Sequence, residues 1–243
     1  MQHQIFSKDD YPGLSTSLVL AGLYPLLQFV ITLILLGVMG ANAALDGDGF
    51  SDIDLVAYAL LTPCIALLAL MRGHLALNKN NSFQEIGLKS PNIPFSEIIG
   101  WGLALTIAVF GVSTIYGLLF PESGQPELEQ ILRLARETDR TLSAFITVGV
   151  ITVLGPIVEE LIFRGYLQTS LMKHTSPMVS IVASGVVFGV VHYNLSMFPV
   201  LAFIGFALGY LYHKSGSLWP SIVFHILNNA IAVGLFFSYP ELF

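Results

Sequence analysis

Charged residues are scarce in this chain: they make up 11% of its 243 positions, whereas 54% are hydrophobic. The mean hydropathy is +0.75. A soluble domain of this length needs more charge than that to cover its surface. The net charge of −6 also gives no sign of the basic face that nucleic-acid binding requires. We therefore expect an integral membrane protein in contact with the lipid bilayer, with no nucleic-acid partner.

Cysteine occurs once, as Cys64 in an apolar stretch. An intrachain disulfide is therefore impossible, and we expect no redox chemistry. A cleavable signal peptide is not indicated either, because the first residues, MQHQIFSKDDYPG, are polar and mixed in charge.

Long apolar runs dominate the rest of the chain, and several exceed the roughly eighteen residues that mark a spanning helix. We expect seven such segments, at 14–40, 55–77, 95–120, 141–171, 178–193, 198–212 and 218–238. The fifth and sixth are short for a complete crossing. The predicted fold class is all-α: a polytopic transmembrane helical bundle of about seven to eight membrane helices.

The positions of Lys and Arg predict the orientation, because cytoplasmic loops carry an excess of both. A cytoplasmic N-terminus places six of them on the inner side: Lys8, Arg72, Lys79, Lys89, Lys173 and Lys214. It leaves three on the outer side, in one longer loop: Arg133, Arg136 and Arg140. We therefore expect a multi-pass protein of the plasma (inner) membrane of a prokaryote, with its N-terminus in the cytoplasm.

The longer outer loop, PESGQPELEQILRLARETDR, has its own pattern. Leu128, Ile131, Leu132 and Ala135 recur at helical spacing, and Pro126 suits a first helical turn. This pattern predicts an amphipathic helix. It fits a helix lying on the membrane surface and a solvated connector helix equally well.

Three charges interrupt the fourth apolar run, in GPIVEELIFRGYLQ at 155–168. Each charge inside a spanning segment costs at least about 2.5–3.5 kcal/mol. Glu160 and Arg164 share a helix face and can form a structural ion pair, because they are four residues apart. Glu159 points about 100° away and has no partner at that spacing. We therefore expect Glu159 to be available for chemistry.

Two later runs supply further polar groups. SGVVFGVVHYN places His192 four residues after Phe188, and SLWPSIVFHILNNA places His225 one turn before Asn229 on the same face. A single histidine in a helical bundle is just as often a hydrogen-bonded packing residue. Two histidines, a same-face asparagine and a buried glutamate together favour a site.

These motifs resemble a known family. EELIFR, FGVVH and HILNN match, in order, the EExxxR, FxxxH and HxxxN motifs of the CAAX-protease and bacteriocin-processing (CPBP or Abi) intramembrane proteases. The resemblance extends from about Thr141 to Ala232 and includes the GSLWP that precedes the last motif. It implies that 141–243 is a catalytic helical core. We expect 1–140 to hold about three membrane helices and the amphipathic surface segment.

The resemblance also implies site residues for a membrane-embedded peptidase. The candidate catalytic residues are Glu159, Glu160, His192, His225 and Asn229. Glu159 would act as general base with His192 holding the water, and His225 and Asn229 would stabilise the oxyanion. We favour no cofactor, although Glu159, His192 and His225 would suit a catalytic zinc ion. Against zinc, the chain has no HExxH motif.

Two other functions stay open. A proton-coupled transporter is one, because Glu and His chains also build proton relays. It would normally show a second charged cluster and repeated halves, which we do not find in the sequence. A non-catalytic binding or bacteriocin-immunity protein of the same fold is the other. For a peptidase the substrate is a peptide or membrane protein, and the sequence indicates neither whether it is prenylated nor the oligomeric state.

Overall fold

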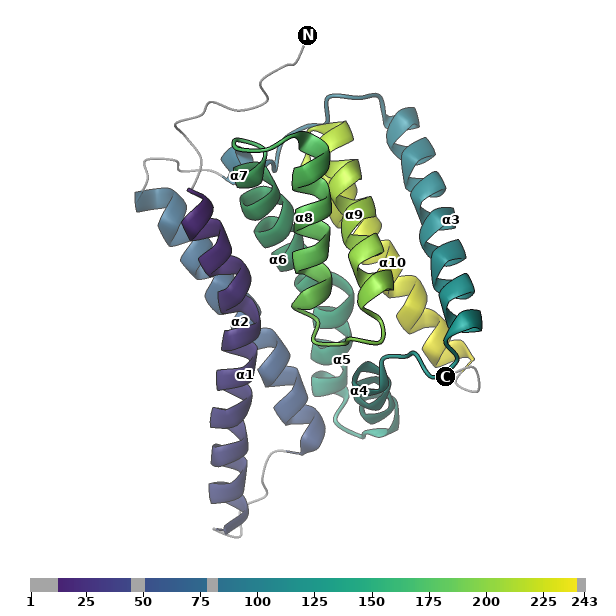
Figure 1. Cartoon of the computed structure of the whole chain (residues 1–243). Coiled ribbons are helices and arrows are strands. Elements are labelled where there is room, and N and C mark those ends of the chain that lie inside the picture. Colours follow the sequence, from purple (N-terminus) through teal and green to yellow (C-terminus); the bar gives the residue numbers. More distant parts are fainter. Residues whose placement is uncertain (1–12, 45–50, 78–82, 240–243) are drawn as a thin grey trace.

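A computed structural model describes residues 13–44, 51–77 and 83–239 of the chain. Lys8 and Lys79, which entered the orientation argument, lie outside the described residues. All regular secondary structure in the described part is helical. The all-α prediction is therefore confirmed (Figure 1).

Most helices coincide with the apolar runs of the sequence. They are α1 (Leu14–Ala44), α2 (Asp52–Leu77), α3 (Phe95–Leu119), α8 (Pro177–Val190), α9 (Phe198–Ser215) and α10 (Leu218–Ser238). The fourth run is divided into α5 (Thr141–Gly149), α6 (Gly155–Glu160) and α7 (Thr169–Leu171), separated by the π-helical segments η2 (Val150–Leu154) and η3 (Leu161–Gln168). A short 3₁₀ helix, η1 (Phe83–Ile86), and the helix α4 (Pro126–Glu137) complete the described elements.

Five helical stretches in the described residues are long and apolar enough to cross a membrane: Leu14–Val38, Asp52–Leu77, Phe95–Leu119, Thr141–Leu171 and Leu218–Ser238. Helix α8 is apolar but shorter than these. The chain is therefore a polytopic helical membrane protein, as predicted. The predicted count of seven to eight membrane helices depends on the two helices α8 and α9, which do not meet these criteria.

Helices α8 and α9 form the most closely packed pair in the bundle (Figure 1). A Cβ atom at Gly205 would lie 2.8 Å from the Cα of Gly185, and a Cβ at Gly185 would lie 2.8 Å from the backbone nitrogen of Phe206. No side chain fits at such distances, so the two backbones can approach only because both positions are glycine.

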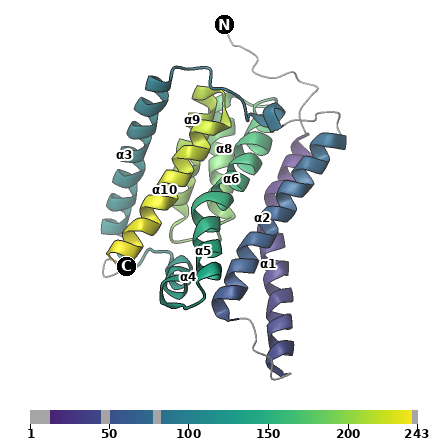
Figure 2. The same ribbon diagram turned by 180° about the vertical axis from the view of Figure 1, so that it is seen from behind.

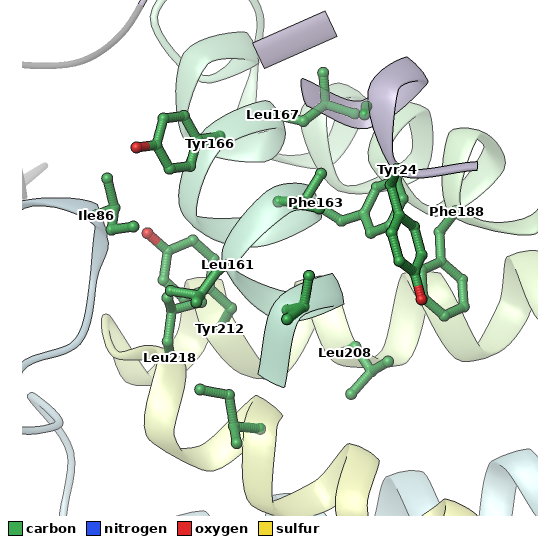
Figure 3. Close-up of a cluster of buried hydrophobic side chains, with 14 of the residues drawn as sticks. Tyr24, Ile86, Leu161, Phe163, Tyr166, Leu167, Phe188, Leu208, Tyr212 and Leu218 are labelled. Carbon is green, nitrogen blue, oxygen red and sulfur yellow. The ribbon is translucent and has the colours of Figure 1, made fainter. Parts of the chain in front are cut away.

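The main hydrophobic core surrounds η3 (Figure 3). Seen from behind, α10 runs beside α6 and α9 and closes that side of the bundle (Figure 2). Helix α1 packs on α2 and also contacts η3 and α7, and the hydroxyl oxygens of Ser17 in α1 and Ser170 in α7 lie 2.7 Å apart. The N-terminal helix is thereby attached directly to the segment that carries the charged motif.

Helix α4 crosses the end of the bundle near α5 and α10 (Figure 1). Its Leu132 is buried with Val233 and Phe236 of α10. The guanidinium groups of Arg133 and Arg136 lie 5.9 and 5.8 Å from the centre of the Phe236 ring. The prediction of an amphipathic helix is confirmed. The apolar side around Leu132 packs on the protein itself, and the position of the helix on the membrane surface stays a prediction.

Candidate active site

The two adjacent glutamates end α6, between the π-helical segments η2 and η3. Insertions of this kind are frequent at functional sites, because they redirect side chains within a continuous helix. The turn that joins η2 to α6 is tight: a Cβ atom at Gly155 would lie 2.9 Å from the carbonyl oxygen of Val150. Glycine at position 155 therefore permits the backbone path that leads to Glu159.

Glu160 and Arg164 form a fully buried ion pair. Arg164 Nη1 lies 3.0 Å from Glu160 Oε1, and both side chains have no exposed surface. Arg164 Nη2 also donates a hydrogen bond to the carbonyl oxygen of Gly205 at 2.9 Å. The guanidinium carbon lies 4.8 Å from the centre of the Phe188 ring. These partners are all protein groups, so the pair that the four-residue spacing predicted sits inside the bundle, where α8 and α9 shield it from lipid.

Glu160 also contacts His225, a relationship that the sequence did not reveal. His225 Nδ1 lies 3.1 Å from Glu160 Oε1. An ionised carboxylate can only accept a hydrogen bond, so Nδ1 carries the hydrogen and donates it. The other ring nitrogen, Nε2, then faces Glu159, with 3.7 Å between Nε2 and Glu159 Oε2. That distance exceeds a direct hydrogen bond. Glu160 therefore orients the ring, and Glu159 faces its second nitrogen.

Glu159 has a second partner that sequence reasoning missed. The hydroxyl of Tyr24, on α1, donates a hydrogen bond to Glu159 Oε1 at 3.0 Å. Gln28 lies one turn further along α1 and lines the same cavity as Glu159. The sequence does contain a pattern that could have indicated this contact: Tyr24 and Gln28, two side chains with polar ends, lie four residues apart in an otherwise apolar run. Such a pair marks the face of the helix that meets other polar groups.

His192 and Asn229 are each held by a backbone carbonyl. His192 Nδ1 lies 2.7 Å from the carbonyl oxygen of Phe188, which fixes the hydrogen on Nδ1 in the neutral ring. Asn229 Nδ2 donates to the carbonyl oxygen of Ile151, in η2, at 2.9 Å. One amide N–H of Asn229 is thus bound to the protein backbone. The sequence had predicted only that this side chain would stabilise an oxyanion.

One cavity of about 540 Å³ brings most of the candidate residues together. Glu159, His192, His225 and Asn229 all line it, although they come from α6, from the turn after α8 and from α10. Tyr24, Gln28 and Asn228 also contribute to its wall, as do Gln125, Glu127, Leu128 and Ile131 at the start of α4. Glu160 and Arg164 are not in the wall and lie buried behind it. The cavity is therefore polar at the motif residues and partly covered by α4.

The geometry does not fit the zinc site that the sequence left open. Within the described ranges, no three His, Cys, Asp or Glu side chains are grouped so that they could hold one metal ion. Glu159 and His225 approach each other, but Glu159 Oε1 accepts from Tyr24, and His192 does not complete a ligand set. What the cavity wall offers is a carboxylate, two oriented imidazoles and an amide.

Comparison with known proteins connects this arrangement to a family. Residues 141–231 match the family described as type II CAAX prenyl endopeptidase Rce1-like. This range nearly coincides with the extent of the resemblance drawn from the motifs, and the prediction of the family is confirmed.

A curated protein of Bacillus subtilis (strain 168), named "Putative membrane peptidase YdiL", is 26% identical over 145 residues. The alignment covers 56% of this chain and 57% of that protein, so the chain spans little more than half the length of this relative. No solved structure matches the chain significantly. Residues 141–231, which contain the glutamate pair, both cavity histidines and Asn229, are thus similar to the Rce1-like family of type II CAAX prenyl endopeptidases.

Proposed function

We propose that this chain is an intramembrane endopeptidase that hydrolyses a peptide bond in a membrane-associated protein or peptide. The observation that carries the proposal is the convergence of Glu159, His192, His225 and Asn229 on one cavity in the bundle. The similarity to a peptidase family supports the reaction class. Peptide hydrolysis needs a base for water and donors for the oxyanion, and these four side chains supply both.

Glu159 acts as the general base. Its Oε2 takes a proton from a water molecule in the cavity, and the water oxygen forms a bond to the carbonyl carbon of the scissile peptide. Glu159 then gives the same proton to the leaving nitrogen as the carbon–nitrogen bond breaks. The carboxylate ends as it began, so no other proton donor is consumed. General-base assistance of this kind contributes about 10²–10⁴-fold to the rate.

The two histidines and the asparagine hold the water molecule and donate hydrogen bonds to the oxyanion. His192 uses Nε2 to hold the water, because its Nδ1 is engaged by the carbonyl of Phe188. His225 donates from Nε2 to the oxyanion, while its Nδ1 is held by the carboxylate of Glu160. Asn229 uses its second amide N–H as a further donor, since the first is directed to Ile151.

The placement of the chain in the membrane completes the proposal. We place α8 and α9 in the same layer as the five longer stretches, because they pack between them and shield the buried ion pair. This gives seven membrane segments, with the N-terminus in the cytoplasm of a prokaryotic cell. Residues 141–243 form the catalytic core, and 1–140 supply three membrane helices and α4.

Comparative peptidomics of membranes tests the proposal. Three proteins are compared: wild type, Glu159→Gln, and Glu97→Gln, whose glutamate is exposed on α3 away from the cavity. Cleavage fragments should be present with wild type and Glu97→Gln and absent with Glu159→Gln, at equal protein level and thermal stability. Identical fragments in all three would contradict the proposal and favour a carrier or a binding protein.

A further inference from the structure

Helix α1 lies outside the region that matches the peptidase family, yet it contributes to the cavity. Tyr24 is buried, with 8% of the residue exposed, and Gln28 lies one turn later on the same face. Both residues line the cavity beside Glu159. The wall of the candidate active site therefore includes a helix whose Tyr24 precedes Glu159 by 135 residues.

The contact between Tyr24 and Glu159 is specific to one carboxylate oxygen. The phenol donates to Oε1 at 3.0 Å, whereas Oε2 is the oxygen that faces His225 Nε2 at 3.7 Å. A glutamate side chain has three rotatable bonds and loses up to about 1.5–2 kcal/mol of rotamer freedom when it is fixed. A donor on one oxygen selects the rotamer in which the other oxygen is turned to His225.

The tyrosine is itself rigidly placed. Its ring belongs to the main hydrophobic core, beside Phe188 and Phe163 (Figure 3). The contact between Ser17 and Ser170 ties the preceding turns of α1 to the chain that continues from the charged motif. The donor therefore has a fixed position relative to Glu159, which is what a group that orients another side chain requires.

We propose that Tyr24 is a positioning residue of the active site: its hydroxyl holds Glu159 so that Oε2 is directed at the reacting atoms, and α1 thereby completes the site carried by residues 141–231. This inference rests on the proposed role of Glu159. Orientation acts on the reacting geometry and leaves substrate binding unchanged, so the loss of the hydroxyl appears in kcat and not in KM.

Tyr212 provides the matched control. Its hydroxyl is also buried and also hydrogen-bonded, lying 2.9 Å from the hydroxyl of Thr169, but the residue does not line the cavity. If Tyr24 did no more than satisfy a buried phenol, Tyr24→Phe and Tyr212→Phe would have the same effect: a small loss of stability for one hydrogen bond and no separate effect on turnover.

The test uses the full chain in liposomes, with a peptide spanning a cleavage site found in the membrane comparison above. Tyr24→Phe is expected to lower kcat by about ten-fold or more with KM within about two-fold, whereas Tyr212→Phe keeps both within about two-fold. Infrared difference spectra give a second readout that is independent of turnover. The carboxylate band that Glu159→Gln removes should shift in Tyr24→Phe and stay in place in Tyr212→Phe.

A kcat for Tyr24→Phe within two-fold of wild type, or an unshifted Glu159 band, would overturn the proposal. An equal fall of kcat in both variants would overturn it as well, because it would assign the effect to lost packing. Absence of cleavage by the wild type would contradict the proposed function instead. In that case the infrared band still decides whether Tyr24 holds Glu159.

Discussion

Arg164 Nη1 lies 3.0 Å from Glu160 Oε1 at a depth where neither side chain has any exposed surface. The pair interrupts a membrane-spanning run, and its other partners come from three further helices: the carbonyl of Gly205 in α9, the ring of Phe188 in α8 and the imidazole of His225 in α10. Both charges are therefore surrounded by protein groups and not by water. Such a pair is expensive to break, because removing one partner leaves the other charge buried alone.

Replacing Arg164 should therefore destabilise the protein strongly. We expect Arg164→Met to lower the free energy of unfolding by about 3–5 kcal/mol, and the double variant Glu160→Gln/Arg164→Met to recover part of that loss. Arg72→Met is the control, because Arg72 is exposed near the end of α2 and should change stability by about 0.5 kcal/mol or less. Unfolding in detergent measures all three. Equal stability of Arg164→Met and Arg72→Met would contradict the structure of the pair.

The close approach of α8 and α9 gives a second stability prediction. A methyl group at Gly205 would meet the Cα of Gly185 at 2.8 Å, so Gly205→Ala forces the two backbones apart. The expected cost is about 1–3 kcal/mol. Gly111→Ala on α3 is the control, since a Cβ there meets nothing within 4 Å. The control should be neutral or stabilising by up to about 1 kcal/mol. Thermal unfolding measures the stability of both variants. A stability of Gly205→Ala equal to that of the wild type would contradict this packing.

Metal chelation should leave cleavage intact. Glu159 and His225 are the only two potential ligands of the sequence-derived set that contact each other in the described structure, which is one fewer than a catalytic zinc site uses. Activity measured after dialysis against a strong chelator is expected to equal that of the untreated protein. Loss of activity on chelation, with recovery on adding zinc, would overturn the metal-free mechanism.

The predicted orientation can be read from cysteine labelling. In a Cys64→Ala background, which removes the only native thiol, single cysteines are placed at Glu122 and at His174, both exposed on opposite sides of the expected membrane. A membrane-impermeant maleimide added to intact cells should label Glu122→Cys and leave His174→Cys unlabelled until the cells are opened. The reverse pattern would place the N-terminus outside.

The helices and the local ion pair could be predicted from the sequence for simple physical reasons. Apolar runs fixed the bounds of the segments at 141–171 and 218–238, because a spanning helix must be apolar along its whole length. The spacing of Glu160 and Arg164 predicted their contact, because residues four apart share a helix face. Both arguments use only interactions within one helix.

The missed features depend on contacts between distant parts of the chain. His225 and Glu160 are 65 residues apart, so no local pattern indicates which nitrogen of the ring is bound. Tyr24 in an apolar run suits an interfacial position as well as a site, and its partner lies 135 residues away. The apolar stripe of α4 indicates that one side of the helix is buried, but it does not identify α10 as the helix against which that side packs.

The rate of peptide cleavage by purified Glu159→Gln protein in liposomes tests the central claim most directly. With Glu97→Gln as the control and the wild-type substrate in excess, we expect kcat of Glu159→Gln to fall by about 10²–10⁴-fold while folding and substrate binding remain normal. Cleavage by Glu159→Gln within a few-fold of wild type would contradict the assignment of this carboxylate as the base, and with it the proposed active site.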